Sequence, residues 1–162
     1  MWSYSRRHVL LASVALMGCG FTPVYGPNGV GHSLQGQIEI DTPTNTNTYN
    51  LVSYMEDRLG RPNSAKYGLS YAVNTRQKGL AVTASQTIVR YNVLGELSYA
   101  LRDLETNSVV ASGKVKASTA YSASATTIAM QAAREDAHKR LMVALADRVI
   151  ERLFLTVPGA NE

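Results

Sequence analysis

Hydrophobic and polar residues alternate along most of the middle of the chain, and the pattern then changes to a helical period. Strict alternation is typical of strands with one buried face, whereas apolar residues three or four positions apart indicate an amphipathic helix. The predicted strands cover residues 37–41, 67–73, 80–104 and 109–121. The predicted helices cover residues 49–59 and 126–155. The resulting order, β-α-β-β-β-α, predicts an α+β fold in which two helices pack on one face of a four-stranded, largely antiparallel sheet.

Short polar segments are expected to reverse the chain between the later strands. Gln77-Lys78-Gly79 is predicted to join the second and third strands, and residues 105–107 are predicted to join the third and fourth. The alternation changes phase near residues 85–87, which predicts a bulge or a break, because one extra residue exchanges the two faces of a strand. The sheet face left uncovered by the helices is expected to carry Arg90, Asn92, Glu96, Ser98, Arg102, Ser112, Lys114, Lys116 and Ser118.

The first 18 residues have the pattern of a bacterial lipoprotein export signal. Arg6 and Arg7 precede an apolar run from Val9 to Met17, which is too short for a membrane span of roughly 20 residues. The run ends at Gly18, a small residue directly before Cys19, as in a lipobox. We therefore predict that residues 1–18 are cleaved and that Cys19 carries a covalent diacylglyceryl group and an N-acyl chain. The paired arginines also resemble a twin-arginine signal, so the sequence leaves the export route open.

The residue after the cysteine and the glycine-rich segment that follows suggest how the protein is held in the cell. Gly20 stands where an aspartate would favour retention at the inner membrane, so we expect the outer membrane, with the protein facing the periplasm. Residues 19–36 are rich in glycine and proline and are predicted to form a lipidated, flexible tether. Residues 37–157 are predicted to form the α+β domain, and residues 158–162 a C-terminal tail.

Composition excludes several classes of function once the signal is removed. The formal net charge falls from +4 for the full chain to +2, because two arginines leave with residues 1–18, so a nucleic-acid partner is not expected. The single cysteine excludes an internal disulfide and a cysteine-based zinc site. No catalytic motif is present, and the two histidines left after cleavage, His32 and His138, are far apart in the sequence. We therefore expect no enzymatic activity, no catalytic residue, no metal and no cofactor beyond the lipid.

The strand tyrosines and the basic residues each allow two interpretations. Tyrosines on the apolar side of the strands could form a carbohydrate platform, but core packing is favoured for Tyr67, Tyr71, Tyr91 and Tyr99. Four basic residues are either ordinary solvated or edge-protecting side chains, or contacts for phosphate groups. These four candidates are Arg76, Lys78, Lys114 and Lys116.

The predicted mature N-terminus carries a family resemblance. The run Cys19-Gly20-Phe21-Thr22-Pro23-Val24-Tyr25-Gly26 resembles the mature start of the lipopolysaccharide-assembly lipoprotein family LptE, and the element order over residues 37–155 is similar to that family's fold. The resemblance implies a non-enzymatic plug inside the outer-membrane β-barrel LptD, which assists assembly of the barrel and binds lipopolysaccharide for insertion into the outer leaflet. The family's basic contact positions do not align onto basic residues here, so only the role of Cys19 is carried over.

Two other functions stay open at the level of the sequence. The chain could be a generic outer-membrane lipoprotein that scaffolds another envelope complex, or a small lipid-anchored hydrolase. The second would need an arranged acid, base or nucleophile that the sequence does not display.

Overall fold

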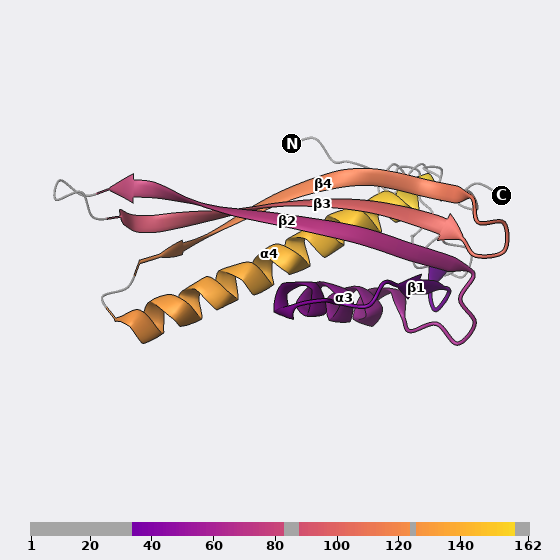
Figure 1. Ribbon diagram of the computed structural model, residues 1–162, viewed down its shortest axis with the longest axis horizontal. Helices are drawn as coiled ribbons and strands as arrows, with labels where there is room; N and C mark the ends of the chain where they lie inside the picture. Colours follow the sequence, from indigo (N-terminus) through magenta and orange to yellow (C-terminus); the bar gives the residue numbers. More distant parts are fainter. Residues whose placement is uncertain (1–33, 83–87, 124–125, 158–162) are drawn as a thin grey trace, which may run out of the picture.

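The computed structural model of the protein describes residues 34–82, 88–123 and 126–157 (Figure 1). Its elements are β1 (Ile38–Ile40), α3 (Thr46–Leu59), β2 (Tyr67–Val82), β3 (Ile88–Asp103), β4 (Val109–Ser122) and α4 (Thr127–Thr156). Several predicted features lie outside the described residues: the signal segment, Cys19, most of the tether, the phase change at residues 85–87 and the tail at 158–162. Within the described residues, neither α3 nor α4 is long and apolar enough to cross a membrane.

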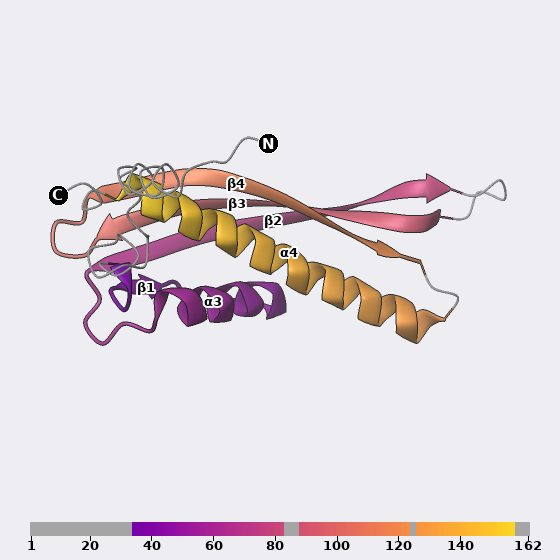
Figure 2. The ribbon, with the colours of Figure 1, turned by 180° about the vertical axis from the view of Figure 1, so that it is seen from behind.

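The sheet has the predicted number of strands and the predicted order of elements. Its strands lie in the order β1-β2-β3-β4; β1 is parallel to β2, and the other neighbours are antiparallel. Both helices lie on the same side of the long, twisted sheet, with α4 running along its length and α3 beside α4 (Figures 1 and 2). The α+β prediction of two helices on one face of a four-stranded sheet is therefore confirmed.

The turn predicted at Gln77-Lys78-Gly79 is wrong. These residues belong to β2 and pair with Val93, Asn92 and Tyr91 of β3, respectively. The register shifts just after Gly79, so this glycine marks an irregularity within a long hairpin instead of a reversal of the chain. Arg76 and Lys78 consequently lie within a strand, and the residues at 80–82 end β2 instead of beginning β3.

Helix α3 begins three residues before the predicted start at Tyr49. Asn45 is the N-cap: its side-chain oxygen accepts a hydrogen bond from Thr48 N at 3.0 Å, and the Thr48 hydroxyl accepts one from Asn45 N at 3.0 Å. This reciprocal pair is a capping box, which satisfies backbone donors that have no partner inside the helix. The packed domain also begins before residue 37, because Leu34 is only 1% exposed.

The core lies between the helix-facing side of the sheet and one stripe of α4. The buried residues of α4 are Ala137, Leu141, Met142, Leu145, Ala146, Val149, Ile150 and Leu153. Opposite this stripe, Gly95 in β3 lets the helix approach closely: a Cβ at this position would lie 2.9 Å from Leu145 Cδ1 and 3.0 Å from Leu141 Cδ2. The prediction for the long final helix agrees with α4 within one residue at each end, and the buried residues of α4 recur every three or four positions from Ala137 to Leu153.

Candidate functional site: the open face of the sheet

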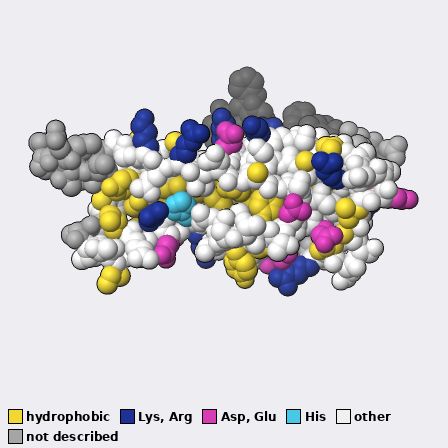
Figure 3. Space-filling view, viewed as in Figure 1, with side chains coloured by type: hydrophobic (Ala, Val, Ile, Leu, Met, Phe, Trp, Pro, Cys, Tyr) yellow, Lys and Arg dark blue, Asp and Glu magenta, His cyan; other side chains and the backbone are white. Residues whose placement is uncertain are grey.

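The face of the sheet opposite the helices is exposed and mainly basic. Even-numbered residues of β3 and β4 share this face with their partners in β2, because side chains alternate along each strand and partners lie side by side. Its basic residues are Arg76, Lys78, Arg90, Arg102, Lys114 and Lys116. Its acidic residues are Glu39 and Glu96. In Figure 3 this face is seen edge-on at the top of the molecule, and Lys and Arg side chains (dark blue) gather along this upper margin.

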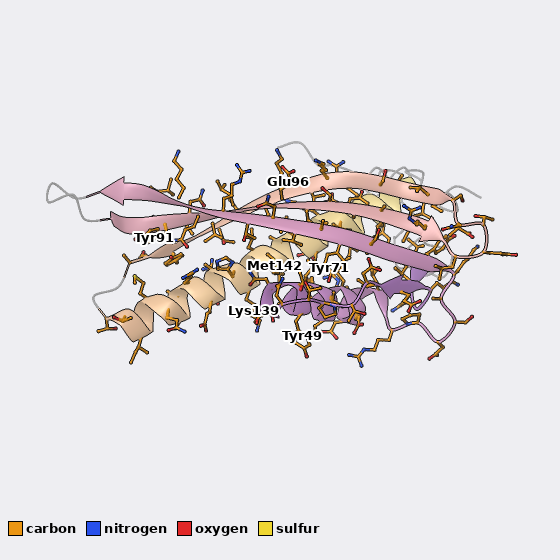
Figure 4. The ribbon with its side chains drawn as sticks, viewed as in Figure 1. Tyr49, Tyr71, Tyr91, Glu96, Lys139 and Met142 are labelled. Carbon is orange, nitrogen blue, oxygen red and sulfur yellow. The ribbon has the colours of Figure 1, made fainter. Side chains whose placement is uncertain are left out.

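Glu96 lies near the centre of this face and neutralises part of its charge (Figure 4). Its carboxylate lies 3.1 Å from Lys116 Nζ and 3.6 Å from Lys114 Nζ. The hydrogen bond from Lys116 and the charge of both lysines hold the pKa of Glu96 below its ordinary value. All three side chains are well exposed, so these ion pairs contribute little to folding and mainly set the local charge.

Arg76 and Lys78 differ from the two lysines because they have no ion pair within the described residues. Arg76 lines a shallow depression of about 310 Å³ together with Asn74, Leu94, Glu96 and Lys116. The structure thus brings the four predicted basic residues onto one face but divides them into two kinds. Among the described residues, Arg76 and Lys78 in β2 have no ion-pair partner, whereas Lys114 and Lys116 in β4 both pair with Glu96 of β3.

Further basic residues that sequence reasoning did not select as candidates lie near the outer edge of β4. Arg148 and Arg152 of α4 line a cleft of about 690 Å³ with Lys114 and Lys116. The Arg148 guanidinium also donates a hydrogen bond to the backbone oxygen of Lys116. Since Arg148 lies 32 residues after Lys116 in the sequence, no local pattern could place these arginines beside the strand. Only the packing of α4 against β4 reveals the pairing.

The helix-facing side holds the tyrosines and the described histidine. Tyr99 is 6% exposed in the core, and Tyr67, Tyr71 and Tyr91 pack against it, so the prediction of core packing is confirmed. His138 lies 3.5 Å, Nδ1 to Nδ2, from Asn47, and burial, followed by the charge of Arg134, lowers its pKa. Across residues 34–82, 88–123 and 126–157, no group of three or more His, Cys, Asp or Glu side chains is placed to hold a metal ion.

Comparisons with known proteins find similarity at the level of structure. No family model and no curated protein matches the sequence. A crystal structure of a protein provisionally described as a lipoprotein from Caulobacter crescentus CB15 matches with a TM-score of 0.66 and 22% identity, over 78% of this chain and 94% of that chain. Rare lipoprotein B from Shewanella oneidensis matches with a TM-score of 0.58 and 13% identity, over 74% of this chain and 93% of that chain.

A third match points in the same direction. The minor lipoprotein from Acinetobacter baumannii has a TM-score of 0.54 and 14% identity, over 74% of this chain and 89% of that chain. These identities are low, so the comparisons establish a common architecture. The chain has the fold of these bacterial lipoproteins.

Proposed function

We propose that this protein is a lipid-anchored outer-membrane lipoprotein of the LptE type, which plugs an LptD-like β-barrel, assists its assembly and binds lipopolysaccharide. The proposal rests on one N-terminal motif and one fold found together in the same chain. A Cys19-Gly20-Phe21 start of the kind found in that family precedes a domain with the fold of several bacterial lipoproteins. The role is structural and binding, without catalysis.

The open face of the sheet supports the binding role. Lipid A carries phosphate groups, and Lys and Arg form strong charge-assisted hydrogen bonds with phosphates. Arg76 and Lys78 have no acidic partner to displace, whereas Lys114 and Lys116 would have to leave Glu96. A polar, charged face also suits the water-filled lumen of a large barrel.

Lipopolysaccharide binding by charge-neutralised variants tests this assignment. The double variant R76Q/K78Q should bind purified lipopolysaccharide on the order of ten-fold more weakly at low salt, and the difference should shrink as salt rises. The matched variant K114Q/K116Q removes the same charge from the same face and should lose less, because Glu96 already offsets those lysines. R134Q/K139Q on α4 is the control away from this face. Equal losses in all three variants would show that only net charge matters.

Depletion of the protein tests the cellular role. Without it, surface lipopolysaccharide and the mature form of the barrel should both decrease. If both stay normal, the LptE-type assignment fails. A pull-down that recovers another envelope protein and no LptD-like barrel would favour a generic scaffolding lipoprotein instead.

The anchor is tested at its single acceptor residue. Cys19→Ala should abolish incorporation of labelled palmitate, because the thiol is the acyl acceptor. Two or three acyl chains bind firmly to a bilayer at about 0.8 kcal/mol per buried CH₂, so the variant should also leave the membrane fraction. Continued labelling of C19A would overturn the lipobox assignment.

A further inference from the structure

Most of the outer edge of β2 has no neighbouring strand. β1 covers only Tyr67–Leu69, and the chain then turns away at Asp41, whose N–H donates to Leu69 O at 3.0 Å. This bond shows that the backbone groups of Leu69 point outward, and alternation gives the same direction to Val73, Thr75 and Gln77. Within the described residues, nothing pairs with these outward N–H and C=O groups. The result is an open edge of about 13 Å between Val73 and Gln77.

At the opposite edge of the sheet, side chains of α4 cover part of β4. The outward carbonyl of Lys116 in β4 accepts a hydrogen bond from Arg148, and that of Ala120 accepts one from Arg140 Nη2 at 3.3 Å. Side chains of α4 therefore occupy acceptors that an added strand would need on β4. Covering an edge in this way is a known protection against unwanted strand pairing. The edge of β2 lacks such a cover.

A groove lies directly beside the open edge of β2, on the helix-facing side. It has a volume of about 1070 Å³, and Thr75 and Gln77 form its margin on β2. The N-terminal turn of α3 contributes Asn47 and Asn50, and Tyr91 belongs to the sheet side. The groove exists because α3 runs under only the part of the sheet near β1, so that α4 alone covers the far part (Figures 1 and 2). We name this the distal groove.

The two faces beside the open edge differ in chemistry. On the open face, Arg76 and Lys78 of β2 are exposed and have no ion-pair partner within residues 34–82, 88–123 and 126–157. On the other face, Asn47, Asn50 and Gln77 present amide groups to the distal groove, and α4 adds charged side chains of both signs to its lining, among them Arg134, Glu135 and Lys139. A strand laid along the edge would place alternate side chains near the two cations and the remaining ones in the groove.

We propose that the β2 edge from Val73 to Gln77 binds an extended segment of a partner protein as an additional strand of the sheet. Main-chain hydrogen bonds hold the segment, acidic side chains at alternate positions meet Arg76 and Lys78, and small polar side chains enter the distal groove. The cationic margin selects against a second copy of this chain, because like charges brought together across paired strands are destabilising. This interaction goes beyond the proposed function, since it requires neither lipopolysaccharide nor a barrel.

Amide exchange with a model peptide tests the proposal on the full mature chain. The probe is a peptide of about nine residues in which glutamate alternates with threonine, and its control replaces glutamate with lysine. Binding of the glutamate peptide should slow exchange of the Val73, Thr75 and Gln77 amides at least about ten-fold, because each gains a hydrogen bond. The Asn74 and Arg76 amides, which face β3, should change little. The lysine peptide should protect none of them.

A proline substitution separates strand addition from other modes of binding. Thr75→Pro removes the outward backbone N–H of residue 75 and leaves the hydrogen bonds to β3 in place. An edge strand tolerates proline at such a position, because its N–H faces away from the neighbouring strand. T75P should abolish binding of the glutamate peptide, while T75A, which keeps the backbone donor, should bind it normally. Circular dichroism checks that both variants fold; if T75P does not, Val73→Pro, at the next outward position, replaces it.

Several outcomes would overturn the proposal. One is that the glutamate peptide binds T75P with the same affinity as the unchanged protein, or that it protects amides of β4 and not those of β2. Another is the absence of protection at millimolar peptide. Protection of the three β2 amides in the free protein would also overturn it, because a second copy or another part of this chain would then occupy the edge. Sedimentation would distinguish those two occupants.

Discussion

Replacing Gly95 with alanine tests how the sheet and α4 fit together. The added Cβ would lie 2.9 Å from Leu145 Cδ1 and 3.0 Å from Leu141 Cδ2, both on fully buried side chains. Ordinary carbon–carbon contacts are about 3.5–4.0 Å, so both leucines would have to retreat by roughly half an ångström or more. The interior is closely packed, and such a shift cannot be confined to one side chain.

Two opposing contributions set the expected size of the effect. Overpacking a core costs about 1–3 kcal/mol, whereas Gly→Ala stabilises by about 0.4–1 kcal/mol through the unfolded chain where the backbone is compatible. We therefore expect G95A to lower the free energy of unfolding by about 1–2 kcal/mol. Leu145→Ala alone should cost about 2–5 kcal/mol, because it leaves a cavity.

The double variant separates close contact from other effects of glycine. In the L145A background the nearest atom is gone and Leu141 can move into the space, so G95A should become neutral or stabilising. Urea denaturation of the four proteins in the cycle gives the coupling energy, which we expect to be about 1 kcal/mol or more in the favourable direction. If G95A costs the same in both backgrounds, the approach of α4 is not the reason for glycine at this position.

Three further predictions concern local structure and charge. Asn45→Ala removes the α3 cap and should cost about 1 kcal/mol in urea denaturation, whereas N45D, which keeps an acceptor, should cost much less. Burial lowers the pKa of His138 from 6.5, so the unfolded chain binds more protons than the folded one as the pH falls below 6.5. Stability should therefore decrease below pH 6.5 and level off once the pH is below the folded pKa, and H138Q should flatten this dependence. Glu96→Gln should hardly change the urea midpoint but should strengthen binding to anionic vesicles at low salt, and unchanged binding would refute a role for Glu96 in setting the charge of the open face.

The elements with strong periodicity could be predicted from the sequence, and those that depend on pairing could not. The apolar stripe of α4 predicts an amphipathic helix, because apolar residues three or four positions apart from Ala137 to Leu153 fit a 3.6-residue period. Gln77-Lys78-Gly79 has turn-like composition, yet its pairing with β3 keeps it in β2. Local propensity was overridden there by a ladder of cross-strand contacts along the whole hairpin.

The candidate site also combines features that the sequence predicts with features that only the tertiary structure sets. Alternation alone places Lys114 and Lys116 on one face with Glu96, since the side-chain period of a strand is two. The sequence by itself therefore determined the element order and the basic side of β4, and it predicts the lipid anchor at Cys19. Tertiary structure alone decided that β1 stops after Ile40 and leaves the edge of β2 open beside the distal groove. Such features depend on where separate segments end relative to one another in space, which no local pattern of residues specifies.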